Sequence, residues 1–86
     1  MSVKAIRLSQ HARDRLVPRG ATEQEVIEAI RTAAWQRAEL GRWECRKVFR
    51  ANRQWHGRRY ASKVVRPVFV EELREVVVVT VYVYFE

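Results

Sequence analysis

The amino-acid sequence predicts an α+β fold in which two N-terminal helices pack on a small, mostly antiparallel sheet of three to four strands. Two observations lead to this prediction. The first half of the chain holds two helix-start signals, and most of the chain after Trp43 either alternates between apolar and polar residues or is rich in valine. The 86 residues, of which 48% are hydrophobic, are expected to form one domain over residues 1–86.

The N-terminal segment is expected to form a short strand followed by a helix. Residues 3–8 alternate weakly, which indicates an opening strand. Ser9 is a favoured N-cap residue and predicts a helix that runs to about Val17. We expect Pro18 and Gly20 to end this helix, because proline cannot continue a helix and glycine tolerates a positive φ angle.

A second helix is predicted from Thr22 onward. Thr22 and Glu25 form a capping-box pattern, in which each side chain can bond the backbone N–H of the other residue. Apolar residues then follow at helical spacing, namely Val26, Ile27, Ile30, Ala33 and Ala34. Gly41 is expected to lie in the loop after this helix.

The first long strand of the sheet is predicted around Cys45. Apolar residues alternate there with Arg46 and Arg50, so that one face of the strand is mostly apolar and the other is cationic. Lys47 falls on the apolar face, which the pattern does not explain. Residues 52–57 are a plausible hairpin connection.

Two further strands complete the predicted sheet. The first runs over about residues 58–70, and Pro67 is expected to restrict it to a sheet edge or a bulge. Residues 71–74 turn the chain, and residues 76–85 form the last strand. Because both faces of that strand are apolar, we expect it to lie inside the sheet.

Positive charge is concentrated in the middle of the chain. Counted by segment, the net charge is +4 for residues 1–20, −2 for 21–41, +8 for 42–66 and −3 for 67–86. The basic residues are 14 Arg and 3 Lys, and guanidinium groups present a bidentate fork to phosphate oxygens. Two interpretations stay open: a surface that binds a polyanion, or an arginine-rich composition of ordinary surface positions.

Cysteine and hydropathy patterns indicate the compartment. Cys45 is the single cysteine, so neither a disulfide framework nor a thiolate metal site is expected, which fits a reducing cytoplasm. No secretion signal is recognisable, and the apolar run of residues 76–85 is about half the length that a membrane span requires. We therefore expect a cytoplasmic protein without membrane contact, metal or cofactor.

Several motifs resemble a known family. The opening Ser-Gln-His-Ala-Arg-Asp-Arg-Leu of residues 9–16 is followed by Arg19-Gly20 and by the Thr22/Glu25 helix start. Arg59-Tyr60 and Val79-Thr80-Val81-Tyr82 follow in the second half. Over about residues 8–84 the chain resembles a family of small prokaryotic domains of unknown function, which is grouped with the RelE/ParE-like toxin superfamily.

The resemblance implies a fold and a class of function. It implies helices before an antiparallel sheet, whose concave basic face grips a partner. RelE-like members cleave messenger RNA in the ribosome without metal, ParE-like members inhibit DNA gyrase, and both are usually silenced by an antitoxin. The chain is thus expected to be a toxin-like protein of a toxin–antitoxin pair.

Metal-independent RNA cleavage requires a base for the 2′-hydroxyl, cations for the developing charge and an acid for the leaving oxygen. The catalytic candidates are His11, Arg59, Tyr60 and Tyr82. The candidates for nucleic-acid binding are Arg15, Arg46, Arg50, Arg58 and Lys63. Structural alternatives stay open: capping for His11, half-buried packing for the tyrosines, and a solvated sheet face for the strand arginines.

Two classes of function follow from these candidates. The first is a ribonuclease that acts on messenger RNA, possibly at the ribosome. The second is a non-catalytic module that uses the same basic face to hold nucleic acid, a ribosome or an acidic protein, with gyrase inhibition as a variant. The apolar last strand also predicts either a homodimer through sheet edges or a protective antitoxin.

Overall fold

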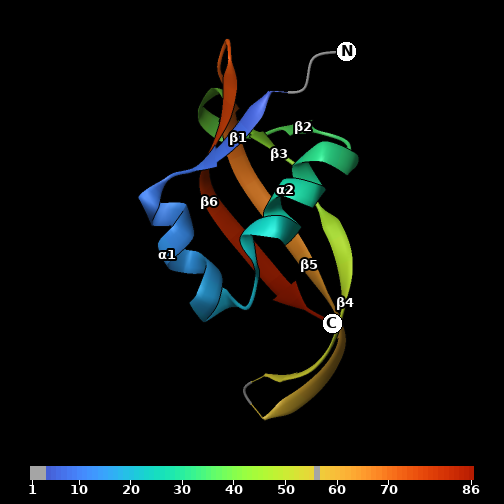
Figure 1. The fold of residues 1–86 in the computed structure, drawn as a ribbon. Coiled ribbons are helices and arrows are strands. Elements are labelled where there is room, and N and C mark those ends of the chain that lie inside the picture. Colours follow the sequence, from blue (N-terminus) through green and yellow to red (C-terminus); the bar gives the residue numbers. More distant parts are fainter. Residues whose placement is uncertain (1–3, 56) are drawn as a thin grey trace.

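The computed structural model describes residues 4–55 and 57–86. Two helices lie on the same side of one mixed sheet, as Figure 1 shows. The predicted α+β class and the position of the helices are confirmed, but the described residues form six strands with mixed pairing instead of three to four. The elements are β1 Ala5–Leu8, α1 Gln10–Arg19, α2 Glu23–Thr32, β2 Gln36–Arg37, the 3-10 turn η1 Glu39–Gly41, β3 Trp43–Glu44, β4 Lys47–Trp55, β5 Arg58–Glu71 and β6 Glu75–Phe85.

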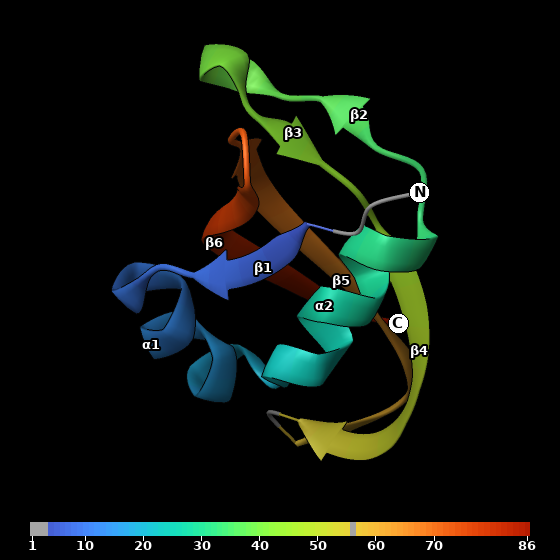
Figure 2. The same cartoon turned by 45° about the horizontal axis from the view of Figure 1, so that its top comes forward.

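The long strand β5 organises the sheet. The strand order is β1-β6-β5-β3-β2, and β4 pairs with the same edge of β5 that β3 occupies further along. Figure 2 shows β2 and β3 at one end of the molecule and the β4–β5 hairpin at the other. Since β5 contacts three strands, it forms the middle of the sheet. The predicted interior position of the last strand holds for residues 75–78, which lie between β1 and β5, whereas the rest of β6 pairs with β5 alone among the described strands.

The opening strand makes the one parallel pairing of the described sheet. β1 runs parallel to the first residues of β6, with Ala5 opposite Glu75 and Leu8 opposite Val78. Arg7 donates hydrogen bonds of 3.1 and 3.2 Å to the Glu75 carboxylate, and this bond lowers the pKa of Glu75. The first strand of the chain is therefore joined directly to the start of the last strand.

The first helix begins as predicted and ends later. The Ser9 hydroxyl oxygen accepts a hydrogen bond from the Ala12 N–H at 3.2 Å. The helix continues through Pro18 to Arg19 and ends at Gly20, whose φ angle is 79°. The expectation that Pro18 would end the helix is wrong, because in the last turn a missing N–H costs a single hydrogen bond.

The second helix carries the predicted capping box. The Thr22 N–H donates to Glu25 Oε1 at 2.9 Å, and the Glu25 N–H donates to Thr22 Oγ1 at 3.2 Å. Val26, Ala29 and Ile30 are buried against the sheet. The helix ends at Thr32, so that Gly41 lies in η1 and not directly after the helix.

The β4–β5 hairpin differs from its prediction. β4 extends to Trp55, across the segment that was expected to form a loop at residues 52–57. A register shift between Arg50 and Arg53 marks a bulge, where Asn52 adopts a φ angle of 37°. Asparagine tolerates this left-handed conformation. The residue that indicated a turn in the sequence therefore lies in a bulge within β4.

Pro67 lies inside the sheet, and the expectation of an edge position or a bulge at this residue is wrong. It is buried and stands opposite Val81 of β6. Its carbonyl oxygen accepts from the Cys45 N–H at 3.4 Å, so its nitrogen also faces the β3–β4 side. On that side, Cys45 and Arg46 lie between β3 and β4 and belong to neither strand. The N–H that proline lacks would therefore point to a place where the hydrogen-bond ladder of β5 is already interrupted.

A bulge in β6 decides which face its side chains reach. Val68 pairs with Thr80, whereas the next residue, Phe69, pairs with Val78. Val79 is thus an extra residue on β6. Val78 before it and Val81 after it are both buried under the helices, and the alternation changes phase between them.

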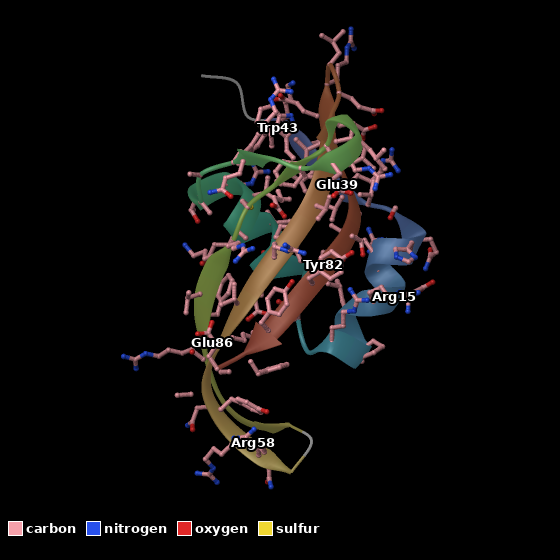
Figure 3. The ribbon with its side chains drawn as sticks, turned by 180° about the vertical axis from the view of Figure 1, so that it is seen from behind. Arg15, Glu39, Trp43, Arg58, Tyr82 and Glu86 are labelled. Atoms are coloured by element: carbon pink, nitrogen blue, oxygen red, sulfur yellow. The ribbon has the colours of Figure 1, made fainter. Side chains whose placement is uncertain are left out.

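The side chains on the uncovered side of the sheet form what we call the open face. Its central residues are Ser62, Val64, Arg66 and Val68 on β5 and Thr80, Tyr82 and Tyr84 on β6. Figure 3 views the molecule from this side, with Tyr82 near the middle of the face, α2 behind the sheet and α1 beside it.

Sheet edges are protected in two ways. β1 covers the first part of β6, and the Arg19 side chain donates to the Val81 carbonyl further along. The outer edge of β4 carries cationic Lys47 and Arg50. Lys47 donates to Thr32 Oγ1 at 2.8 Å, which explains its place on the helix-facing side of the strand.

The core centres on Phe69, which is fully buried, and the Trp35 ring meets it edge-on with a centroid distance of 4.8 Å. We predict that Phe69→Ala lowers the free energy of unfolding by about 3–5 kcal/mol, because the change removes a large buried side chain and leaves a cavity. Urea denaturation measures this loss. Leu73→Ala is the control, since Leu73 is 88% exposed in the β5–β6 turn. An equal effect of both changes would contradict the core assignment.

Candidate nucleic-acid interface

The centre of the open face is a contact between an arginine and two tyrosine rings. Arg66 stands opposite Tyr82 in the β5–β6 register. The guanidinium carbon of Arg66 lies 4.6 Å from the ring centroid of Tyr82 and 5.6 Å from that of Tyr84. Both tyrosines keep more than a third of their surface exposed. Each contact of this kind contributes roughly 0.5–1 kcal/mol at an exposed site, which holds the three side chains together.

The first helix adds a second guanidinium group to the same ring. The guanidinium carbon of Arg19 lies 5.2 Å from the Tyr82 ring centroid. Arg19 is held there because it also donates to the Val81 carbonyl. Arg15 is exposed one helical turn earlier on α1, and Figure 3 shows it on the helix beside the open face.

The arginines predicted on the first long strand also belong to the open face. Arg50 stands opposite Ser62. Glu44 stands opposite Val68 and Lys47 opposite Val65, and this constant register places Arg46 level with Arg66. Arg46, Arg66 and Arg19 therefore form a line across the strands, with Tyr82 between the last two, and we call these three residues the arginine row.

A cleft adjoins the arginine row at the end of the sheet that carries β2 and β3. It encloses about 530 Å³ between the loop around η1 and the sheet surface. Its cationic side chains are Arg37, Arg42 and Arg66, and its carboxylates are Glu39 and Glu44. The remaining lining residues are Ala38, Leu40, Val68, Thr80 and Tyr82.

The charges inside the cleft are only partly paired. Arg66 Nη1 lies 3.4 Å from Glu44 Oε2, which is long for a charge-assisted hydrogen bond. The buried Nε of Arg66 has no hydrogen-bond partner. Arg37 lies over the Trp43 ring, with 4.9 Å between its guanidinium carbon and the ring centroid. Cations outnumber carboxylates in the cleft, so an anion would find donors there.

The catalytic candidates Arg59 and Tyr60 lie far from Tyr82. Arg59 is exposed at the tip of the β4–β5 hairpin, together with the binding candidate Arg58, and this hairpin projects away from the helices in Figure 3. Tyr60 lies at the base of this hairpin, where its ring packs 5.5 Å from that of Phe85. Tyr60 precedes Arg66 by six residues of extended strand, a separation of about 20 Å.

His11 is also separate from the tyrosines of the sheet. It is exposed in the first turn of α1, eight residues before Arg19. Eight residues of α-helix span about 12 Å. His11, Tyr60 and Tyr82 are thus not brought together as an acid–base set.

Lys63 does not join an exposed phosphate-binding surface as expected. It is 5% exposed on the helix-facing side of β5. Its ammonium donates to the Gly20 carbonyl at 2.7 Å and to Glu25 Oε1 at 2.8 Å. Glu25 is also part of the capping box, so Lys63 ties the start of α2 to the sheet.

Four arginines of the site were not among the sequence candidates: Arg19, Arg37, Arg42 and Arg66. In the sequence, Arg19 is recognisable only as part of the Arg19-Gly20 motif. For Arg66 a signal exists, because it alternates with buried Val65 and Pro67 and must face the other side of the sheet. Its meeting with Tyr82 depends on the pairing of β5 with β6, which a local pattern does not give.

In the described part of the chain, no group of three His, Cys, Asp or Glu side chains is placed to hold a metal ion. Among the same residues, no helix has the length and apolar character to cross a membrane.

No protein-family model matches the chain, and comparisons with curated proteins and with solved structures found no match. The RelE/ParE-like resemblance therefore stays a prediction from the motifs.

Lys63→Met separates structural from binding roles. Methionine keeps an unbranched apolar side chain but loses the ammonium, and we expect the free energy of unfolding to fall by about 1–3 kcal/mol. Because Lys63 is buried, RNA affinity should not change. Urea denaturation and an RNA titration measure the two quantities. Weaker RNA binding at unchanged stability would show that Lys63 contacts the ligand.

Cys45 is buried on the helix-facing side, and burial raises the pKa of its thiol to about 11. We expect slow labelling by a thiol reagent at pH 8 in the native protein and fast labelling in urea. Since the folded pKa is above that of the unfolded thiol, this group should lower stability as pH rises from about 9 to 11. Cys45→Ala should reduce that pH slope. Fast native labelling at pH 8 would contradict the burial.

Proposed function

We propose that this protein binds single-stranded RNA on its open face. The observation that supports the proposal is the arginine row beside two exposed tyrosine rings on a sheet surface that no helix covers. Guanidinium groups bind backbone phosphates, and tyrosine faces stack on unpaired bases. The combination is typical of proteins that hold single strands.

The strands set the path of the RNA. Arg50 lies further along the open face than Arg46, toward the turn of the β4–β5 hairpin. The hairpin continues the positive surface with Arg58 and Arg59, and residues 46–70 contain no Asp or Glu. A strand of RNA that follows β5 would meet Arg66, Arg50 and the hairpin arginines in turn, with Glu86, which pairs with Ser62, as a carboxylate-bearing residue beside this path. The excess of cations favours association through counterion release.

Cleavage of messenger RNA is the second candidate function. It is favoured by one observation, the position of Tyr82 close to two guanidinium groups. The Tyr82 oxygen would accept the proton of the 2′-hydroxyl, whose oxygen attacks phosphorus as the bond to the 5′-oxygen breaks, and the leaving 5′-oxygen would take a proton from water. Arg19 and Arg66 would stabilise the negative charge that develops on the phosphate oxygens. In this version Tyr82 works without His11 or Tyr60, which lie elsewhere.

The toxin–antitoxin context belongs to the same proposal. An acidic antitoxin segment that covers the open face would compete with RNA for the arginine row, because both ligands are polyanions. Binding at the ribosome would use the same surface. A homodimer through sheet edges is the alternative assembly.

Arg46→Ala combined with Arg50→Ala tests RNA binding. Both side chains are exposed, so the fold should persist. We expect at least about tenfold weaker binding of a single-stranded oligonucleotide, because each arginine gives a charge-assisted bond to phosphate. The dependence of log affinity on log salt should flatten by about 0.7 for each lost phosphate contact.

The control for this change is Arg31→Ala, since Arg31 is exposed on α2 in the helix layer. It should bind RNA like the unchanged protein. If affinity falls by the same factor for each lost charge in both variants, binding depends on net charge alone and the open-face proposal is wrong.

Tyr82→Phe and Tyr82→Ala distinguish the two candidate functions. Phenylalanine keeps the stacking ring, so RNA affinity should change little, whereas alanine should weaken binding by about fivefold or more. Gel analysis of incubated RNA reports cleavage. Products that disappear with Tyr82→Phe at unchanged affinity would establish the nuclease role, and persistent products would exclude Tyr82 as the catalytic group.

A further inference from the structure

From the cleft beside the arginine row we infer a specific ligand, the phosphomonoester end of an RNA strand. This inference rests on the proposed RNA binding and adds that the site distinguishes a terminal phosphate from the internal phosphodiesters. The shared chemistry is a phosphate with three free oxygens, found at either a 5′ or a 3′ end.

The first argument is that the cleft closes the path along the sheet. Its lining combines the loop residues 37–42 with Val68, Thr80 and Tyr82 of the open face. The loop therefore stands against the sheet surface, and Figure 3 shows the part that carries Glu39 beside β5 at the end of the face beyond Tyr82. An RNA strand that runs along β5 from the hairpin is blocked by this loop, so the cleft accommodates an RNA end better than a continuing RNA chain.

The second argument is the number of donors. Arg37, Arg42 and Arg66 line the cleft together with Glu39 and Glu44, so the residues around it carry one net positive charge. An internal phosphodiester carries one negative charge, whereas a phosphomonoester carries about 1.5 to 2 and accepts bonds on three oxygens. The higher charge suits a cleft whose lining residues are positive on balance.

The third argument is the incomplete bonding of Arg66. Its Nε is buried without a partner, and its contact with Glu44 is 3.4 Å long. An unsatisfied buried donor is unfavourable, so a small shift of Arg66 toward a terminal phosphate would exchange a poor arrangement for a bidentate one. Glu44 then competes with the phosphate for the guanidinium group of Arg66.

The fourth argument is the apolar side of the cleft. Leu40 is 84% exposed and adopts a left-handed backbone, with a φ angle of 60°. Leucine rarely adopts this conformation, and strained residues gather at ligand sites. With Ala38 and Val68 it gives the base or ribose of the terminal nucleotide an apolar surface.

The test compares four forms of one internally labelled oligonucleotide by fluorescence anisotropy: 5′-phosphate, 3′-phosphate, both, and hydroxyl at both ends. We expect one phosphorylated end to bind about tenfold more tightly than the hydroxyl form, the value of one added charge-assisted bond. The singly phosphorylated form that binds more tightly shows whether the cleft holds the 5′ or the 3′ end. Inorganic phosphate should remove this gain at millimolar concentration.

Two variants assign the gain to the cleft. In Arg42→Ala the affinity ratio between phosphorylated and hydroxyl forms should fall to about one, while Arg31→Ala should keep it. Glu44→Gln removes the competing charge at constant shape and should raise the ratio. A thermal melt confirms that each variant is folded.

Equal affinity for all four forms, or a ratio that Arg42→Ala and Glu44→Gln leave unchanged, overturns the end-binding inference but leaves the proposed RNA binding in place. Absence of binding to every form overturns the proposed function itself, and the inference with it.

Discussion

The site depends on one extra residue in β6. In an unbroken strand, Tyr82 and Tyr84 would share the phase of Val76 and Val78, which are buried under the helices. The bulge at Val79 changes that phase, so that Val81 continues the core while the tyrosines reach the open face. The tyrosines of the open face depend on this irregularity, whereas Arg46, Arg50 and Arg66 reach the same face through the alternation of their own segments.

The open face is held together by contacts that are weak individually. Arg66 and Arg19 meet the same tyrosine ring, and Arg19 also satisfies a carbonyl on the outer edge of β6. These cations repel one another, and Glu44 offsets part of that repulsion. An anion placed between these guanidinium groups would reduce their repulsion further. By contrast, the basic residue Lys63 serves the fold and not the open face, because its buried ammonium group bonds the Gly20 carbonyl and Glu25 and so holds the start of α2 on the sheet.

Local sequence signals predicted those parts of the fold that have local causes. The caps at Ser9 and Thr22, the β5–β6 turn and the apolar last strand all depend on neighbouring residues. The parallel β1–β6 pair joins residues about seventy positions apart, and the two-residue strands β2 and β3 carry too little pattern to be recognised. At the site, Arg46 and Arg50 were identified from alternation, whereas Arg19 and Arg66 became site residues only through tertiary contact with Tyr82. Pro67 was misjudged because its missing donor coincides with a break in the neighbouring strand.

The most direct measurement of the central claim is a backbone amide NMR titration with a short single-stranded RNA. The account predicts shift changes on β5 and β6 around Arg66 and Tyr82, at Arg46 and Arg50, and at the end of α1, with little change along α2. Changes confined to the outer surface of the helices, or to the hairpin tip at Arg58 and Arg59, would show that the open face is not the binding surface.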